Sequence, residues 1–271
     1  MMIQIGWCAG MQQAGMLAEA KLDYIECPLS SLPLEGNEAA LAEQLASYAE
    51  SAIPVRAMNL FAPGDMRLVG PDTDPDRFRR YAYKAGEAAS KIGAKVVVLG
   101  SGGARKVPDA WEHQRAEQQL LGCLSFIAEE WRGTGVTLAL EPLNRKETNL
   151  INSVSEAVRL TAQINDPAIR VLADFYHMEE ENEPLSTLMT YKDWIVHIHI
   201  ADTGRLAPGT GVYPYEEFMA TVAAMGYKGM ISAECGRWPE SDEALHDSIA
   251  FMTAMRDRIT DMARTKSSGH A

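Results

Sequence analysis

The run Val-Thr-Leu-Ala-Leu-Glu at residues 136–141 decides the fold, because it places a carboxylate directly after a short apolar segment. Three later runs, at residues 170–173, 195–198 and 230–233, have the same form. The four runs are followed by Glu141, Asp174, His199 and Glu234. In a parallel barrel the C-terminal ends of all strands open onto one face, where the chemistry is found. We therefore expect these four side chains to meet at the mouth of one barrel.

The rest of the chain repeats this pattern of a short apolar run followed by an amphipathic helical segment. Counting such runs gives eight candidate strands, at residues 3–8, 24–27, 55–60, 95–99, 136–140, 170–173, 195–198 and 230–233. Eight βα units of about 33 residues each fill the chain, which is a usual size for such units. Several runs are continuously apolar, as is typical of parallel strands buried on both faces.

These runs predict an α/β fold, a single (β/α)8 TIM barrel over residues 1–264, followed by a disordered tail at 265–271. A doubly wound open sheet is the alternative. It is disfavoured because no Gly-x-Gly-x-x-Gly fingerprint follows the first predicted strand.

The composition restricts the partners of the protein. Its 37 acidic and 25 basic residues give a net charge of −12, whereas binding nucleic acid through phosphates requires a basic face. We therefore expect a small-molecule partner and no nucleic acid. No apolar run approaches the roughly 18 residues that span a bilayer, and the N-terminus lacks the pattern of a signal peptide. The four cysteines form no Cys-x-x-Cys pair and are typical of reduced thiols in a cytoplasmic protein.

The four strand-end side chains have the chemistry of a metal site. Two Glu, one Asp and one His form an oxygen-rich set that suits Mn²⁺ or Mg²⁺ better than structural zinc. Asp174 directly follows an apolar run, and a buried carboxylate costs several kcal/mol unless it is paired or bound to a metal. His197 and His199 alternate along one strand and point to the same side of it. We expect His199 to be the ligand and His197 to be a core or supporting residue.

On these motifs the chain resembles the sugar phosphate isomerase/epimerase family with the xylose isomerase-like barrel, most closely its ketose 3-epimerase and hydroxypyruvate isomerase branches. The resemblance covers nearly the whole length. It implies that one Mn²⁺ ion per chain, or else Mg²⁺ or Co²⁺, is held by Glu141, Asp174, His199 and Glu234. Three further positions match residues that contact the reacting end of the sugar in this family, namely Glu147, His177 and Arg205, and Glu147 would orient a hydroxyl or His177.

The resemblance also implies a mechanism of proton transfer at a carbon next to a carbonyl, through an enediolate. Glu141 and Glu234 would act as the base and the acid on opposite faces of the sugar. Return of the proton to the same carbon gives C3 epimerisation of a ketose, and return to the neighbouring carbon gives aldose–ketose isomerisation. We favour epimerisation because the spacings of Glu147, His177 and Arg205 match that branch.

The N-terminal third departs from the 3-epimerases, because its strand ends carry Trp7 and Cys8, then Glu26 and Cys27, then Asn59. We place Asn59 and Trp111 in the substrate pocket. Trp111 fits an apolar wall for the substrate and a helix-packing residue equally well. The turn Gly-Ser-Gly-Gly at residues 100–103 could cradle a phosphate, but a tight βα turn is the preferred interpretation.

Several other functions remain open. A hydroxypyruvate-type or other aldose–ketose isomerase is compatible with the segment 201–211. A sugar lyase is a third possibility, because an enediolate can also eliminate. An endonuclease IV-like enzyme needs three zinc ions and more than the six histidines of this chain. A non-catalytic sugar-binding barrel has little use for two opposed metal-bound carboxylates. By analogy with the family, we expect a homodimer or homotetramer.

Overall fold

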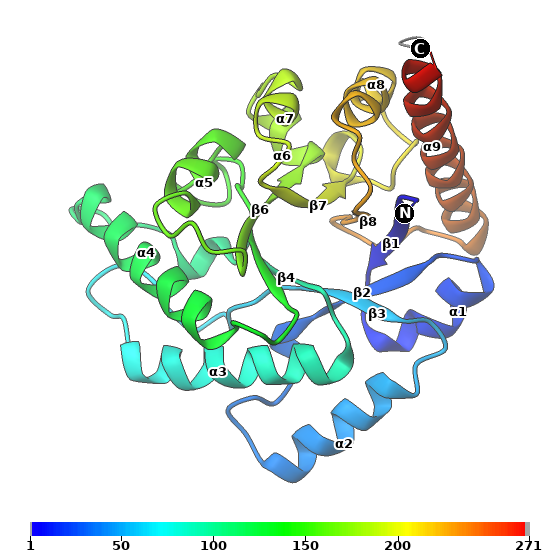
Figure 1. Cartoon of the computed structure of the whole chain (residues 1–271). Helices are drawn as coiled ribbons and strands as arrows, with labels where there is room; N and C mark the ends of the chain where they lie inside the picture. The colour runs from blue at the N-terminus through cyan, green and yellow to red at the C-terminus, as the bar shows by residue number, and fades with distance from the viewer. Residues whose placement is uncertain (1, 269–271) are drawn as a thin grey trace.

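The eight apolar runs form a closed barrel of parallel strands in sequential order, with β1 paired to β8 (Figure 1). This arrangement comes from a computed structural model that describes residues 2–268. The strands are β1 (Gln4–Cys8), β2 (Tyr24–Pro28), β3 (Val55–Asn59), β4 (Val96–Leu99), β5 (Thr137–Leu140), β6 (Ile169–Asp174), β7 (Ile195–Ile200) and β8 (Met230–Ala233). The predicted single (β/α)8 barrel is confirmed, and no strand end differs from its prediction by more than two residues.

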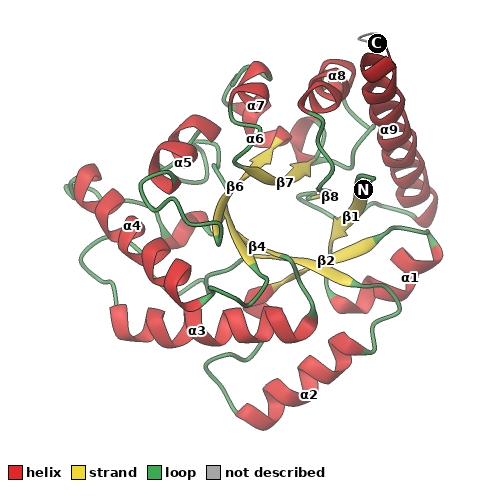
Figure 2. Ribbon diagram, in the orientation of Figure 1, coloured by secondary structure: helices red, strands yellow, loops and turns green. Residues whose placement is uncertain are grey.

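Helices form an outer ring around the strands (Figure 2). They are α1 (Ala14–Glu19), α2 (Glu38–Ala49), α3 (Pro75–Ile92), α4 (His113–Glu130), α5 (Val154–Thr161), α6 (Phe175–Glu180), α7 (Ser186–Thr190), α8 (Tyr215–Met225) and α9 (Asp242–Ser268). Two short helices, α6 and α7, connect β6 to β7. The long helix α9 closes the ring by packing against α8 and β1 (Figure 1).

Local sequence signals begin and end these helices. The Asp74 carboxylate accepts a hydrogen bond from the Arg77 backbone N–H at the start of α3, and Pro75 occupies the first turn, where a missing N–H is harmless. Gly93 ends this helix in the left-handed conformation, with φ of 89°. The Ser153 hydroxyl accepts from the Glu156 N–H at the start of α5. Helix α3 therefore begins and ends, and helix α5 begins, where the capping residues predict.

The inside of the barrel changes from apolar to polar toward the C-terminal ends of the strands. The apolar layer consists of Tyr24, Ala57, Val96, Val98, Ala139, Leu172 and Met230. Leu172 pairs in register with His197, and two residues further along Asp174 pairs with His199. Because alternate residues of a strand face the same side, the polar side chains lie directly beyond the apolar layer. The register thus places the predicted ligands at the barrel mouth.

Helix α9 reaches into the segment 265–271 that the sequence predicted to be a disordered tail. Helix α9 continues to Ser268, so residues 265–268 are helical, and residues 269–271 lie outside the described part of the chain. The Thr265 hydroxyl donates to the Asp261 and Met262 carbonyls at 3.2 and 3.0 Å, so hydrogen bonding within the helix carries on into the polar segment. No helix within residues 2–268 combines the length and the apolar character that a membrane crossing requires.

Candidate functional site

The structure brings the four predicted ligands together at the barrel mouth. Glu141 follows β5, Asp174 ends β6, His199 lies in β7 and Glu234 follows β8. One ligand atom from each lies within 4.8 Å of the others. His199 Nδ1 is 3.4 Å from Glu141 Oε1 and 3.6 Å from Glu234 Oε2. We call these four residues the ligand cluster.

Three atoms of the ligand cluster are buried and have no hydrogen-bond partner, namely Glu141 Oε1, Asp174 Oδ2 and His199 Nδ1. Buried polar atoms in folded proteins are normally hydrogen-bonded, and an ionised carboxylate can only accept. A divalent cation would satisfy all three at once, and an oxygen-rich donor set with one imidazole suits Mn²⁺ or Mg²⁺. The residues present therefore fit a hard divalent ion.

The charges in the cluster support this fit. Burial, followed by the negative charge of Glu234, raises the pKa of Glu141. Burial alone would also raise the pKa of Glu234, but His199 and Arg205 outweigh it and hold that pKa well below its ordinary value. The positive charge near Glu141 and Glu234 is thus too small to keep both carboxylates ionised without cost. A bound cation would remove this cost.

A fully buried arginine holds the loop that carries Glu141. Arg105 donates to the carbonyls of Gly100 at 2.8 Å, Leu150 at 2.5 Å and Glu141 at 2.5 Å. Burial lowers its pKa to about 10, so the guanidinium stays charged at neutral pH. It therefore ties the β4–α4 loop to the β5–α5 loop. Sequence reasoning missed Arg105, because nothing in its local sequence separates it from a surface arginine.

His177 presents a ring N–H toward the ligand cluster. The backbone and side-chain amides of Asn144 lie 3.2 and 2.8 Å from His177 Nδ1, and because the backbone N–H can only donate, Nδ1 accepts and the proton belongs on Nε2. His177 Nε2 is buried without a partner, 3.5 Å from Asp174 Oδ2. Glu147 was expected to orient a hydroxyl or His177. It reaches His177 only through Asn144, whose side-chain amide donates to Glu147 Oε1 at 3.3 Å.

Arg205 bridges two of the predicted residues. Its guanidinium donates to Glu147 Oε1 at 3.0 Å and to Glu234 Oε2 at 2.5 Å, and it lies over the Tyr176 ring at 5.3 Å. Its Nε is buried without a partner. The backbone of Arg205 is left-handed, with φ of 59°, which turns the chain sharply after β7. Arg205 thus links the β5 and β8 sides of the mouth.

The two residues predicted for the specificity pocket have different surroundings. Asn59, at the end of β3, donates through Nδ2 to Glu234 Oε1 at 3.0 Å and keeps a buried, unpartnered Oδ1. Trp111 lies in the β4–α4 loop under the Arg115 guanidinium, 4.2 Å from the ring centre. Within residues 2–268 no hydrogen bond joins Trp111 to the ligand cluster. The structure therefore connects Asn59 to the cluster and does not connect Trp111 to it.

Unused hydrogen-bonding capacity is concentrated at the barrel mouth. Within the described part of the chain, each residue with a buried side-chain N or O atom that lacks a partner lies at the C-terminal end of a strand or in the connection that follows, which for His177 is the short helix α6. These residues are Gln13, Asn59, Trp111, Glu141, Asp174, His177, His199 and Arg205. Water, an ion or a bound ligand normally satisfies such atoms. The mouth is thus the place where the molecule is built to receive a ligand.

Residues 15–255 match the family described as a xylose isomerase-like TIM barrel. The chain belongs to this family. Similar curated members of the xylose isomerase-like family are epimerases, which confirms the resemblance predicted from the strand-end motifs.

Two of these relatives show how far the sequence similarity extends. A 3-dehydro-D-guloside 4-epimerase from Escherichia coli (strain K12) is 29% identical over 183 residues, which is 61% of this chain and 66% of that protein. A D-psicose 3-epimerase from Ruminiclostridium cellulolyticum is 31% identical over 109 residues, 40% of this chain and 37% of that protein. The matched segments span less than two thirds of either relative's length.

Solved structures of xylose isomerase-like barrels resemble the chain over nearly its whole length. The structure of an L-ribulose 3-epimerase covers 100% of both chains with a TM-score of 0.82 and 19% identity. That of a 3-keto-D-glucoside 4-epimerase from E. coli covers 93% of this chain and 99% of that chain, with a TM-score of 0.79 and 21% identity. At these identities the likeness establishes a common fold.

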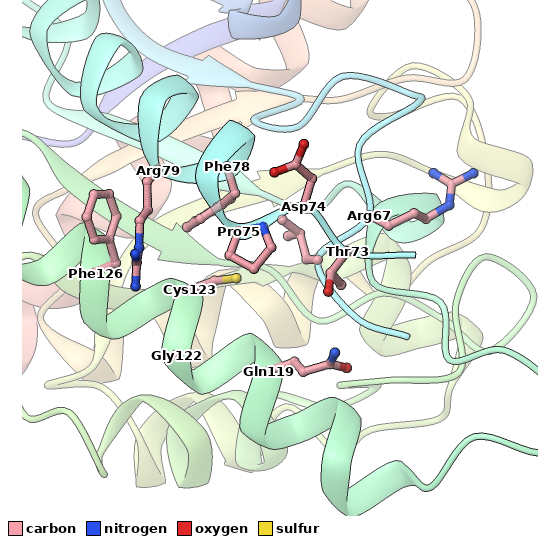
Figure 3. Close-up of a pocket in the computed structure, with 11 residues that line it drawn as sticks. Arg67, Thr73, Asp74, Pro75, Phe78, Arg79, Gln119, Gly122, Cys123 and Phe126 are labelled. Carbon is pink, nitrogen blue, oxygen red and sulfur yellow. The ribbon is translucent and has the colours of Figure 1, made fainter. Parts of the chain in front are cut away.

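This xylose isomerase-like barrel also has a cavity of about 260 Å³ on its outer surface, away from the mouth. The β3–α3 connection and helices α3 and α4 form it, with Phe78, Cys123 and Phe126 among its lining side chains (Figure 3). Arg79 lies over the Phe126 ring at 5.8 Å. None of the lining residues belongs to the ligand cluster, so this cavity is separate from the candidate metal site.

Proposed function

We propose that this protein is a divalent-metal-dependent sugar epimerase or isomerase that moves a proton at a carbon next to a carbonyl, with C3 epimerisation of a ketose favoured. The convergence of three buried, unpartnered acceptors at the barrel mouth carries this proposal: Glu141 Oε1, Asp174 Oδ2 and His199 Nδ1. The sugar epimerases among the relatives support a small sugar as the substrate.

Glu141, Asp174, His199 and Glu234 would hold the ion, with Mn²⁺ preferred over Mg²⁺ or Co²⁺. When bound, a divalent ion would act as a Lewis acid toward the carbonyl and hydroxyl oxygens of the sugar.

Glu141 and Glu234 are the proposed acid and base. They come from β5 and β8, so their carboxylates approach the mouth from different strands of the barrel. One carboxylate takes the proton from the carbon next to the carbonyl, which leaves an enediolate, and the other returns a proton to the opposite face. Asn59 and Arg205 hold one oxygen each of Glu234, and this orients its carboxylate. Return to the same carbon inverts its configuration.

The developing negative charge on the sugar oxygen needs donors that are already in place. His177 supplies Nε2–H, because Asn144 occupies its Nδ1. Arg205 supplies a guanidinium whose unpartnered Nε is buried at the mouth. Donors held rigidly at the point where charge develops stabilise the transition state more than mobile donors do.

Deuterium exchange from solvent tests the proposal most directly. We expect the Mn²⁺-loaded protein to place deuterium at C3 of at least one ketose in a panel. Exchange into hydroxypyruvate or an aldose alone would instead favour the aldose–ketose isomerase alternative, which uses the same pair of carboxylates. Exchange into none of these compounds would contradict the proposal and favour a sugar lyase or a sugar-binding barrel.

The substitution Glu234→Gln tests the acid–base assignment. Glutamine has nearly the same shape as glutamate but cannot carry the proton. General acid–base catalysis contributes about 10²–10⁴-fold to the rate. We therefore expect exchange to fall by about that factor, with the melting temperature of the metal-free protein unchanged. Glu240→Gln in the same β8–α9 connection is the control, because the Glu240 side chain is 79% exposed. Full activity of Glu234→Gln would show the assignment to be wrong.

A further inference from the structure

Glu26 is a buried carboxylate inside the barrel that the proposed chemistry does not use. It lies in β2 and is 0% exposed. Its Oε1 is 3.0 Å from His199 Nε2, and its Oε2 is 2.8 Å from His197 Nε2 and 2.6 Å from Ser232 Oγ. A buried carboxylate is tolerated when such donors surround it. Sequence reasoning assigned Glu26 no role, although a charge inside the apolar run Tyr-Ile-Glu-Cys is a signal that could have marked it.

Glu26 contacts the side of the His199 ring that faces away from the ligand cluster. An imidazole binds a metal through the lone pair of one nitrogen, while the other nitrogen carries a proton and donates it to an acceptor. Glu26 Oε1 is that acceptor, because His199 Nε2 lies 3.0 Å from it. With the proton on Nε2, the lone pair of Nδ1 points toward Glu141 and Glu234, at 3.4 and 3.6 Å.

Neighbouring bonds hold the Glu26 carboxylate in its orientation. The Ser232 hydroxyl donates to Glu26 Oε2, so the Tyr24 hydroxyl, 2.6 Å away, donates to Ser232 Oγ. The Tyr24 ring reaches this position because residue 6 is glycine: a Cβ there would lie 2.4 Å from the ring. His197 occupies the second carboxylate oxygen and is also 3.1 Å from the Met230 carbonyl. The other oxygen is thereby kept for His199.

We propose that Glu26 is a positioning residue that selects which ring nitrogen of His199 faces the ligand cluster, and that it thereby sets the metal affinity of the site. This inference rests on the metal requirement of the proposed function. The Glu26 carboxylate lies beneath the cluster in the barrel, and its hydrogen bonds within residues 2–268 go to side chains of β7 and β8. Carboxylate partners of metal-bound histidines typically change metal affinity by about 10–100-fold.

Titration of chelator-treated protein with Mn²⁺ tests this role. Glu26→Gln keeps the shape but replaces one accepting oxygen by an NH₂ donor, so one imidazole N–H loses its acceptor. We expect Mn²⁺ affinity to fall about 10–100-fold. Glu183→Gln is the matched control, since it makes the same change at a half-buried carboxylate that accepts from the Val154 backbone N–H, outside the ligand cluster; its affinity should equal that of wild type. Wild-type affinity in Glu26→Gln, or an equal loss in both variants, would overturn the proposal.

A second measurement uses the wild-type protein, so it does not depend on whether a Glu26 variant folds. Long-range ¹H–¹⁵N spectra of the metal-free wild-type protein, with His199 assigned by its loss in His199→Asn, report which ring nitrogen carries the proton. We expect a proton on Nε2, and a His199 ring whose Nε2 carries no proton would overturn the proposal. Neither readout depends on turnover. A protein that binds Mn²⁺ but exchanges no deuterium contradicts the proposed function alone, and a wild-type protein that binds no divalent ion overturns both.

Discussion

Gly100 lies so close to the Glu141 carboxylate that a Cβ at position 100 would stand 2.1 Å from Glu141 Oε2. Gly100 is the first residue of the Gly-Ser-Gly-Gly turn after β4, which the sequence favoured as a tight βα turn. The absence of a side chain at position 100 makes room for one oxygen of a proposed metal ligand from the neighbouring strand. The glycine is therefore needed for the contact between two loops.

Gly100→Ala should damage the site without unfolding the barrel. The methyl group would push the Glu141 carboxylate out of position, and a misplacement of about 1 Å can cost about 100-fold in rate. We expect a loss of that order in deuterium exchange, together with weaker Mn²⁺ binding. Gly103→Ala in the same turn is the control, because nothing lies within 4 Å of its Cβ position. Equal activity of the two variants would contradict the proposed placement of Glu141.

Metal removal should affect both activity and stability. We expect purified protein to contain about one Mn²⁺-like ion per chain by elemental analysis, as a single oxygen-rich site implies. A chelator should abolish exchange and lower the melting temperature, because an ion that binds only the folded state stabilises it by about 2.7 kcal/mol at 100 times its Kd. Asp174→Asn should reduce this metal-induced stabilisation. The melting temperature of the metal-free protein should stay unchanged, because Asn can still cap α6. Three zinc ions per chain would contradict the isomerase proposal.

Arg105→Met should destabilise the protein. The substitution leaves the buried carbonyls of Gly100, Leu150 and Glu141 without a donor. Each unsatisfied buried group costs about 1–3 kcal/mol, so a loss on the order of 3 kcal/mol is expected in urea unfolding. Arg105→Lys should not restore the stability, because an ammonium lacks the planar fork of donors. Arg132→Met, whose side chain is 70% exposed, should change little. A similar stability of all variants would refute the role given to Arg105.

Glu180 should contribute stability at neutral pH that acid removes. Hydrogen bonds from Lys146 and then Tyr213 lower the pKa of Glu180 below its ordinary value of 4.5. The unfolded chain therefore takes up the proton first as pH falls. The stabilisation by ionised Glu180 is fully present above pH 4.5. It is lost as the pH falls through the lower pKa that Glu180 has in the folded protein. The urea midpoint of Glu180→Gln should be lower than that of wild type at pH 7 and equal to it in acid.

The adjacent residue, Glu179, is a control because its pKa shifts in the opposite direction. Burial, and then the charge of Glu217, raises the pKa of Glu179. Its ionised form is therefore disfavoured in the folded protein at pH 7, and Glu179→Gln should leave the midpoint equal to or slightly above that of wild type. A lower midpoint for Glu179→Gln at pH 7 would show that the two pKa directions are not the source of the effect.

Most of the fold followed from local patterns. Continuous apolar runs such as residues 136–140 predict buried parallel strands, and Gly93 marks the end of a helix by its left-handed backbone. Composition did not reveal that helix α9 extends to Ser268, into the segment 265–271 that was predicted to be disordered.

The candidate site was partly predictable for the same reason. Glu141, Asp174, His199 and Glu234 each follow or end an apolar run, so strand-end position alone predicted that they would meet. The link from Glu147 to His177 was only partly anticipated, because Asn144 mediates it. Trp111 shows the limit of this reasoning, since its place in a loop does not reveal which side chains it will contact.

By itself, the sequence determined the eight-stranded barrel and the meeting of the four proposed ligands at its mouth, because apolar runs and the residues that end them are properties of neighbouring residues in the chain. Only the tertiary structure decided how these ligands are held. Gly100 lies against Glu141, Arg105 binds loops up to 46 residues away, and Glu26 meets a histidine 173 residues later. Such contacts depend on the pairing of β4 with β5 and on closing β8 onto β1, which bring distant residues together with an orientation that no local pattern encodes.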